Sequence, residues 1–263
     1  IFEVSGNSLQ PSYTTAKILW YKENLPEVYA KIDKILQSNS YIAYKLTGVM
    51  SQDVSQGYGL HCFDMRRAVW DEAMCRRLGI PLEFLPEICD CDHVVGTVTE
   101  KAAEESGLAV GTPVVAGGLD AACGTLGAGV IHPGETQEQG GQAGGMSICM
   151  DEYKADPRLI LGYHVVPGQW LLQGGTTGGG GVMRWFEREF ADYERSVAEE
   201  KGSSLDQLNE IAERVAPGSD GVVFLPYMSG ERSPIWNPNA KGVFYGLDFA
   251  KTKAHMVRAC MEG

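Results

Sequence analysis

Apolar side chains recur every three to four positions in several stretches of the first hundred residues, a spacing that predicts amphipathic helices. The longest stretch runs from Thr14 to Leu36, and Pro26 starts a second helical segment within it, because proline suits the first turn of a helix. Three further helices are predicted, at residues 40–48, 69–81 and 99–108, the first closed by Gly48 and the last capped by Thr99. The middle one ends at Gly79, since glycine readily takes the left-handed conformation that closes a helix.

Beyond residue 110 the pattern mixes strands with helices. The apolar run Pro113–Gly118 predicts a buried strand, and the small residues after Asp120 predict the start of a helix. Strands interrupted by glycines are predicted over residues 135–150 and 163–177, and helices over 178–190, 203–218 and 252–263. A capping box is predicted from Ser204 to Gln207, and Thr252 is the predicted N-cap of the last helix. Such a mixture in both halves predicts an α/β protein with a domain boundary near residues 132–134.

The composition is that of a soluble globular protein, with 44% apolar and 21% charged residues. The formal net charge of −12 argues against a nucleic-acid surface, which needs a basic patch. The sequence shows no apolar run near the ~20 residues of a membrane span and no signal peptide, so we expect no membrane partner. The seven cysteines form no regular framework, which is typical of reduced thiols and predicts a cytoplasmic location.

One cluster has the residue types of a metal site. Cys89, Cys91 and His93 alternate with Asp90 and Asp92, so on a strand the three potential zinc ligands would share one face. The sequence offers no second pair of ligands elsewhere. An edge strand or a loop is therefore the favoured interpretation, and no metal site is predicted.

Candidate chemistry lies in three glycine-rich stretches, at residues 117–129, 138–147 and 174–181. Glycines can serve tight turns and close packing of elements, or they can let backbone amides approach an anion such as a phosphate. The P-loop pattern and a complete dinucleotide-binding fingerprint are both absent, which argues against those two nucleotide sites. The first stretch also holds a lone carboxylate, Asp120, at the junction of an apolar run and a helix of small residues.

Several stretches resemble the FGGY carbohydrate kinases of the actin-like ATPase superfamily. Residues 12–24 resemble the family's first signature, with Lys17 and Trp20 in place. Residues 242–263 resemble the family's second signature. Residues 44–48 and 53–55 resemble two shorter phrases of the family, and residues 224–247 resemble its pentulose branch. Tyr21 and Cys260 depart from the two signatures.

The resemblance gives Asp120 a role. It implies that Asp120 is the catalytic aspartate, which binds the sugar and acts as general base. A sugar hydroxyl has a high pKa, so its attack on a phosphate is helped by a carboxylate that accepts its proton. The small residues around Asp120 would leave room for sugar and γ-phosphate to meet in line. A plain helix N-cap is the other interpretation of Asp120, and both can hold.

The resemblance also implies two segments that bind the ATP phosphates. The family's phosphate hairpin corresponds to Gly141, Gln142, Ala143 and Gly144. Gln142 and Ala143 replace hydroxyl side chains, so hydrogen bonds worth about 1 kcal/mol each are lost while the backbone amides are kept. The second segment is Gly179, Gly180 and Gly181, before a helix. These glycines either bring amides to the phosphates or only let strand and helix turn closely.

A charged pair, Glu231 and Arg232, lies between a glycine and a proline in the segment SGERSP. Two roles are open to it, bracing of a loop and direct contact with substrate. We favour bracing, in which both side chains pair with neighbours.

For the fold, the resemblance implies two ribonuclease H-like (actin-like ATPase) domains, each incomplete in this chain. Residues 1–132 would be the latter part of the N-terminal, sugar-binding domain. Residues 133–263 would be the first part of the C-terminal, nucleotide-binding domain. The family's first phosphate loop and its adenine site have no counterpart in the sequence, so we expect this piece alone to be inactive.

For the function, the resemblance implies a carbohydrate kinase that uses ATP and Mg²⁺ to phosphorylate a small sugar, D-xylulose to xylulose 5-phosphate first. Ribulose, glycerol or a signalling sugar are alternative substrates. From another class, a sugar-binding or regulatory relative that has lost catalysis is the rival hypothesis. The expected partners are the sugar and ATP, and a homodimer is left open.

Overall fold

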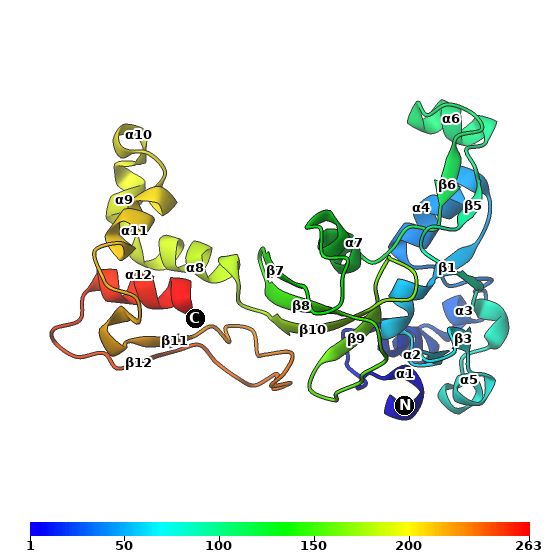
Figure 1. Cartoon of the computed structure of the whole chain (residues 1–263), viewed down its shortest axis with the longest axis horizontal. Coiled ribbons are helices and arrows are strands. Elements are labelled where there is room, and N and C mark those ends of the chain that lie inside the picture. Colours follow the sequence, from blue (N-terminus) through cyan, green and yellow to red (C-terminus); the bar gives the residue numbers. More distant parts are fainter. The chain divides into compact units, whose positions relative to one another are not determined.

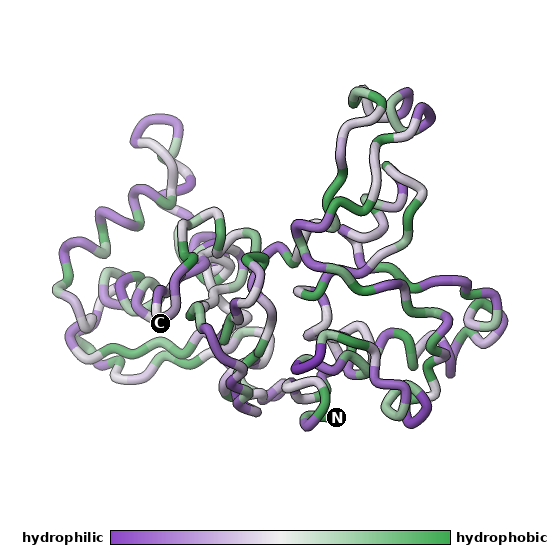
Figure 2. The backbone as a smooth tube through the Cα atoms, turned by 45° about the vertical axis from the view of Figure 1, so that its right-hand side comes forward, coloured by the Kyte–Doolittle hydropathy of each residue, from purple (hydrophilic) through white to green (hydrophobic).

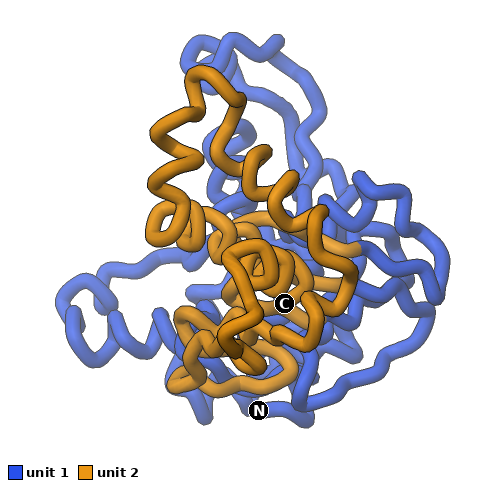
Figure 3. Tube along the Cα trace, turned by 90° about the vertical axis from the view of Figure 1, so that its left-hand side faces the viewer, with its two compact units in different colours: residues 1–137, 147–173 blue, residues 138–146, 174–263 orange.

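The computed structural model describes residues 1–263, which divide into two compact units (Figures 1 and 3). Unit 1 holds Ile1–Gln137 and Ser147–Gln173, and unit 2 holds Glu138–Met146 and Gly174–Gly263. The chain therefore passes from one unit to the other three times rather than at a single boundary. Both units mix helices with strands, as predicted for an α/β protein.

Unit 1 contains short helices and three two-stranded ladders. The helices are α1 (Phe2–Ser5), α2 (Thr14–Asn24), α3 (Pro26–Tyr29), α4 (Ser38–Thr47), α5 (Glu72–Leu78), α6 (Glu100–Ser106) and α7 (Asp120–Gly127), with 3₁₀ helices η1 (Val54–Gly59) and η2 (Leu82–Phe84). The strands are β1 (Ser51–Asp53), β2 (Phe63–Asp64), β3 (Val69–Trp70), β4 (Glu87–Cys89), β5 (Val94–Thr97) and β6 (Pro113–Val115). The pair β1–β4 is parallel, whereas β2–β3 and β5–β6 are antiparallel.

Local sequence explains where these helices begin and end. Gly48 and Gly79 take the left-handed conformation, with φ of 78° and 65°, and close α4 and α5 as predicted. At the start of α6, the hydroxyl of Thr99 accepts the amide of Ala102 at 3.2 Å, which confirms its predicted capping role. Pro26 begins α3, as its fixed φ favours.

A four-stranded sheet follows, in the order β7-β8-β10-β9. Its strands are β7 (Thr136–Gly140), β8 (Gly144–Met150), β9 (Ile160–Tyr163) and β10 (Trp170–Thr176). The pair β9–β10 is antiparallel, with Trp170 opposite Tyr163. Within unit 1, Ala122 of α7 packs in one cluster with Cys149 of β8 and Leu171 of β10, which fixes α7 to these strands.

Unit 2 is built around amphipathic helices. They are α8 (Gly180–Phe190), α9 (Asp192–Ser196), α10 (Ala198–Lys201), α11 (Ser204–Ala212) and α12 (Lys253–Glu262), with η3 (Ser219–Gly221) and the antiparallel strands β11 (Val223–Leu225) and β12 (Val243–Tyr245). Phe186, Leu208 and Val257 are fully buried and join α8, α11 and α12 in one core. Burying each such side chain is worth about 1.5–3 kcal/mol. Figure 2 shows the alternation of hydrophobic and hydrophilic stretches along the chain that amphipathic elements require.

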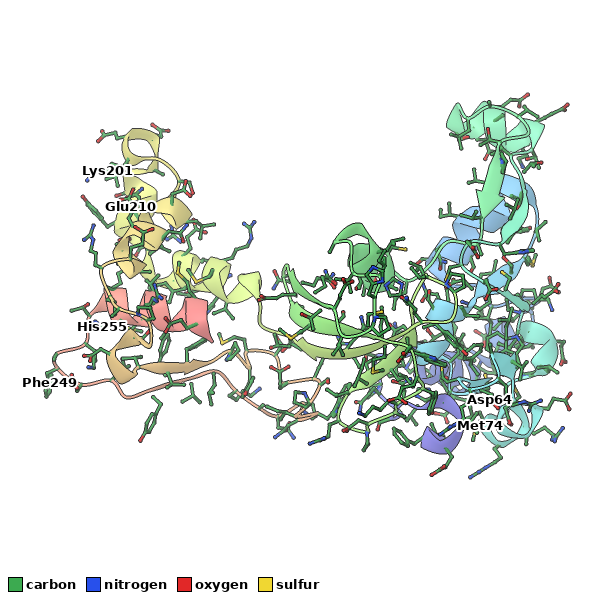
Figure 4. All side chains as sticks on the ribbon, viewed as in Figure 1. Asp64, Met74, Lys201, Glu210, Phe249 and His255 are labelled. Carbon is green, nitrogen blue, oxygen red and sulfur yellow. The ribbon has the colours of Figure 1, made fainter.

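Two local predictions were wrong. The strand β6 is not buried, because its only partner is β5, and Val115 is 47% exposed. The N-cap of α11 is Ser203 rather than Ser204, since the hydroxyl of Ser203 accepts the amide of Asp206. At α12 the prediction is confirmed: Thr252 caps the helix in a reciprocal box with His255, which is labelled in Figure 4.

The cysteine-rich segment forms no metal site. Cys89 ends β4, and the segment turns before β5 begins at Val94. Among residues 1–263 there is no group of three or more His, Cys, Asp or Glu side chains that could hold a metal ion. All seven cysteines are free thiols. None of the helices has both the length and the apolar character needed to cross a membrane.

Candidate active site

The turn before α7 depends on two adjacent glycines. Gly117 has a φ of 76°, which residues with a side chain rarely adopt. At Gly118 an added Cβ would lie 2.5 Å from Val165 Cγ1 and 3.3 Å from Ser55 Oγ. The glycine pair therefore lets the backbone turn sharply and run directly over neighbouring side chains before it enters α7.

Asp120 is the first residue of α7 and its side chain is exposed. Leu119 occupies the N-cap position, so the N-cap interpretation of Asp120 was wrong by one residue. Its Oδ1 accepts the amide of Ala121 at 2.8 Å, and the carboxylate forms no ion pair. A negative charge in the first turn is favoured by the helix dipole. The carboxylate is thus held at the helix start, free of competing cations and open to a ligand.

One face of α7 is open beside this carboxylate. Asp120, Cys123, Gly124 and Gly127 follow one another at helical spacing and are all exposed. A Cβ added at Gly124 or Gly127 would meet no atom within 4 Å. Packing within the chain therefore does not require glycine at these two positions, and the absent side chains leave free space next to Asp120.

Beneath the turn lies a buried carboxylate that the sequence analysis missed, Asp53. It is 0% exposed and caps η1, accepting the amides of Ser55 and Gln56 at 3.1 and 3.3 Å. The hydroxyl of Ser55 donates to its Oδ1 and the side-chain amide of Asn39 donates to its Oδ2, the latter at 2.7 Å. Burial raises the pKa of Asp53, and the hydrogen bonds from Ser55 and Asn39 oppose that rise. The segment Asp-Val-Ser was visible in the sequence only as a family phrase.

In unit 2, the hairpin 141–144 and the start of α8 are in direct contact. The amides of Gly179 and Gly181 donate to the carbonyl of Gln142 at 3.1 and 3.2 Å, and the amide of Gly180 donates to that of Gly141 at 2.7 Å. The fold therefore brings together the two segments predicted to bind phosphate. In this structure the three amides of Gly179–Gly181 bind the hairpin itself.

This contact is backbone against backbone. A Cβ at Gly179 would lie 2.6 Å from the carbonyl carbon of Ala143 and 2.7 Å from the amide nitrogen of Gly144. A Cβ at Gly180 would lie 2.8 Å from the carbonyl oxygen of Gly141. Glycine at these positions is therefore required by close packing, whether or not a ligand also uses them.

The tip of the hairpin combines free amides with a bulky side chain. The backbone amides of Gln142 and Ala143 donate to no group of the chain. The side chain of Gln142 lies against Gly181, in the first turn of α8, where a Cβ would collide with it. A helix N-terminus attracts anions, so the Gln142 side chain occupies space in which a phosphate would bind favourably.

Glu231 anchors the segment that leads into α8. Its buried carboxylate accepts the hydroxyl of Thr176 at 2.7 Å, the amide of Thr177 at 3.2 Å and the amide of Arg232 at 2.6 Å. The hydroxyl of Thr177 donates to the carbonyl of Gly230 at 2.6 Å. Bracing by Glu231 is thus confirmed. The pairing predicted for Arg232 was wrong, because it has no ion pair and its buried Nε has no hydrogen-bond partner.

Matches to known proteins cover both units. Residues 1–127 match the FGGY family of carbohydrate kinases, N-terminal domain, and residues 146–263 match its C-terminal domain. A gluconokinase of Bacillus licheniformis is 32% identical over 265 residues, which take in 100% of this chain and 52% of that protein. A xylulose kinase of Bacillus subtilis (strain 168) is 29% identical over 265 residues, 100% of this chain and 51% of that protein.

Solved structures agree with the sequence matches. The ligand-bound xylulose kinase from Lactobacillus acidophilus superposes with a TM-score of 0.87 at 28% identity, covering 100% of this chain and 52% of that one. The chain thus spans about half the length of the curated relatives it matches. With both domains of one family matched and the fold reproduced, the chain belongs to the FGGY carbohydrate kinases, sugar phosphotransferases with two actin-like ATPase domains.

Proposed function

We propose that the full-length protein containing this chain is an ATP-dependent kinase of a small sugar in which Asp120 is the general base. The observation that carries the proposal is the position of Asp120. Its carboxylate is exposed, free of ion pairs and fixed at the start of α7, beside a face that Gly124 and Gly127 leave open. A general base needs this combination of access to substrate and a fixed orientation.

The chemistry follows from the carboxylate. A sugar hydroxyl approaches along the open face of α7 and passes its proton to Asp120. The hydroxyl oxygen forms a bond to the γ-phosphorus of ATP as the bond between that phosphorus and the β,γ-bridging oxygen breaks, and ADP leaves. Catalysis of such transfers consists mainly of positioning and charge stabilisation.

The phosphates belong to the same proposal. The unpaired amides of Gln142 and Ala143 are the donors available at the hairpin, and backbone amides of this kind bind phosphate in many proteins. The amides of Gly179–Gly181 would have to release the hairpin to join them. Mg²⁺ has no ligand set built by this chain alone, and we assign no step to it. It would reach the site on the ATP phosphates, which it prefers as ligands.

D-Xylulose is the substrate that we propose first. The proposed location is the cytoplasm, because free thiols such as the seven of this chain persist there. A relative named xylulose kinase and one named gluconokinase are similar to this chain at nearly equal identity. Gluconate therefore joins ribulose, glycerol and signalling sugars in the set of substrates to be tested.

The test is a coupled assay of ADP release by the full-length protein, with each sugar in turn. Asp120→Asn is expected to retain the fold and lose about 10²–10⁴-fold in turnover, the usual contribution of a general base. The matched control is Asp206→Asn, an exposed aspartate in the first turn of α11, which is expected to leave turnover unchanged. Turnover of folded Asp120→Asn within threefold of wild type would remove Asp120 from the mechanism.

One observation favours the rival hypothesis of a relative without catalysis. The three amides of Gly179–Gly181 are engaged by the hairpin, and the side chain of Gln142 lies against the helix start. Calorimetric titration of the full-length protein with a non-hydrolysable ATP analogue separates the two cases. Sugar binding without any nucleotide binding supports the rival, whereas binding of both ligands supports the kinase.

A further inference from the structure

We propose that Asp53 is a positioning residue for Asp120, acting through Ser55 and Asn39 on the turn that precedes α7. The inference rests on the proposed role of Asp120 as general base. Asp53 and Ser55 are buried and Asn39 is half-buried, and together they form a network that holds the backbone from Ala116 to Leu119, the last residues before Asp120.

The first connection runs through Ser55. Its hydroxyl donates to Asp53 Oδ1 and accepts the backbone amide of Leu119 at 2.8 Å. Leu119 is the N-cap of α7, immediately before Asp120. The hydrogen bond therefore fixes the peptide plane from which the helix starts, although Ser55 and Leu119 are 64 positions apart in the sequence.

The second connection runs through Asn39. Its Nδ2 donates to Asp53 Oδ2 at 2.7 Å and to the carbonyl of Ala116 at 3.3 Å. Its Oδ1 accepts the side-chain amide of Gln56 at 3.0 Å, so the whole carboxamide is oriented. Asp53 thus reaches both ends of the turn, Ala116 through Asn39 and Leu119 through Ser55.

The position of each hydrogen in this network is fixed by its partners. The amide of Leu119 can only donate, so the Ser55 hydroxyl points its lone pairs at that amide and its hydrogen at Asp53. An ionised carboxylate only accepts hydrogen bonds, which turns the amide group of Asn39 towards Asp53. Asp53 has no ion pair, so its burial is supported by hydrogen bonds alone, a costly arrangement in a protein interior.

Backbone hydrogen bonds also restrict the turn itself. The amides of Ala116 and Gly117 donate to the carbonyls of His93 and Cys91 at 2.9 and 3.0 Å. The backbone at Gly118 then passes over Ser55. The segment that the sequence suggested as a metal cluster therefore contributes backbone carbonyls to the same turn. Since a misplacement of about 1 Å can cost roughly 10²-fold in rate, loss of the Asp53 network is expected to act on turnover.

The decisive variant is Ser55→Ala in the full-length protein, because it removes one hydroxyl and adds no bulk. We expect kcat to fall 10- to 100-fold with little change in the KM values for sugar and ATP. In hydrogen exchange followed by mass spectrometry, the peptide that contains Leu119 should exchange at least tenfold faster, since its amide loses its acceptor. The control is Ser51→Ala, a buried serine of β1 whose side chain has no hydrogen bond to Asp53, Asn39 or Leu119, and neither quantity should change.

A double-mutant cycle distinguishes positioning from general damage. If Ser55 acts through Asp120, then Ser55→Ala should lower kcat no further in the Asp120→Asn background. A full additional loss there, or an unchanged exchange rate at Leu119 in folded Ser55→Ala, would overturn the inference. Should Asp120→Asn itself keep full turnover, the proposed function fails, while the exchange at Leu119 still decides whether the network holds the turn. Asn39→Ala is the second variant, with faster exchange expected around Ala116.

Discussion

The turns before α7 and α8 resemble each other in composition, whereas the glycines at the start of α8 and those within α7 differ in what they do. Each is rich in glycine, starts a helix and is braced by a buried carboxylate, Asp53 for α7 and Glu231 for α8. Each carboxylate acts through a hydroxyl group, that of Ser55 in the first turn and that of Thr176 in the second. The brace is therefore common to both turns, and the difference lies in the glycines of the helices that follow them.

Around α8, glycines permit contact between two stretches of backbone, and a Cβ at Gly179 would collide with main-chain atoms of the hairpin. On α7, a Cβ at Gly124 would meet nothing. The first glycine serves the fold, whereas the second is free to serve a ligand. A glycine-rich sequence thus has two physical causes that composition alone does not separate, whereas the atoms around each glycine do.

The largest expected effect is on stability, at Gly179. In Gly179→Ala the new methyl group would lie 2.6 Å from a carbonyl carbon, and the residue's ψ of −127° at φ −87° is unfavourable for alanine. We expect a loss of roughly 1–3 kcal/mol or more, as for overpacked sites. Urea denaturation of the full-length protein measures it. Gly175→Ala is the control, since its Cβ would meet only Gly144 O at 3.7 Å. Equal stability of the two variants would break the comparison.

The second prediction concerns Gly124 and has the opposite sign. Gly124→Ala should stabilise the protein by up to about 1 kcal/mol, because alanine is the better helix former and the site has room. At the same time KM for the sugar should rise several-fold, since the methyl group enters the open face beside Asp120. Gly162→Ala in β9, which also meets no atom within 4 Å, is the control for KM. An unchanged KM in Gly124→Ala would place the sugar elsewhere.

The third prediction concerns nucleotide binding at the tip of the hairpin. Gln142→Thr together with Ala143→Ser removes the side chain that lies against Gly181 and adds two hydroxyl groups. A hydrogen bond gained is worth about 1 kcal/mol, so an ATP analogue should bind roughly fivefold tighter for each. Calorimetric titration of the full-length protein checks this. Weaker binding by the double variant would show that Gln142 itself holds the nucleotide.

Features set by neighbours in the sequence were predictable. Helix ends at Gly48 and Gly79, the cap at Thr99 and the position of Asp120 at a helix start all depend on residues within a few positions of one another. Where two adjacent residues could both cap a helix, the local sequence pattern did not identify the one that does. Ser203 caps α11 in place of the adjacent Ser204 because the backbone of Ser203, with φ of −50° and ψ of 139°, is not helical, whereas Ser204 is already the first residue of the helix.

The family, the mixed α/β character and the carboxylate and glycines to be tested follow from the sequence, because signatures and helix boundaries are local in the chain. Tertiary structure alone decided how the two turns are held. The Ser55–Leu119 bond spans 64 positions and the Thr176–Glu231 bond spans 55. Only the fold brings such distant groups together. Burial then makes each hydrogen bond necessary, because an unpaired polar group in the interior cannot hydrogen-bond to water.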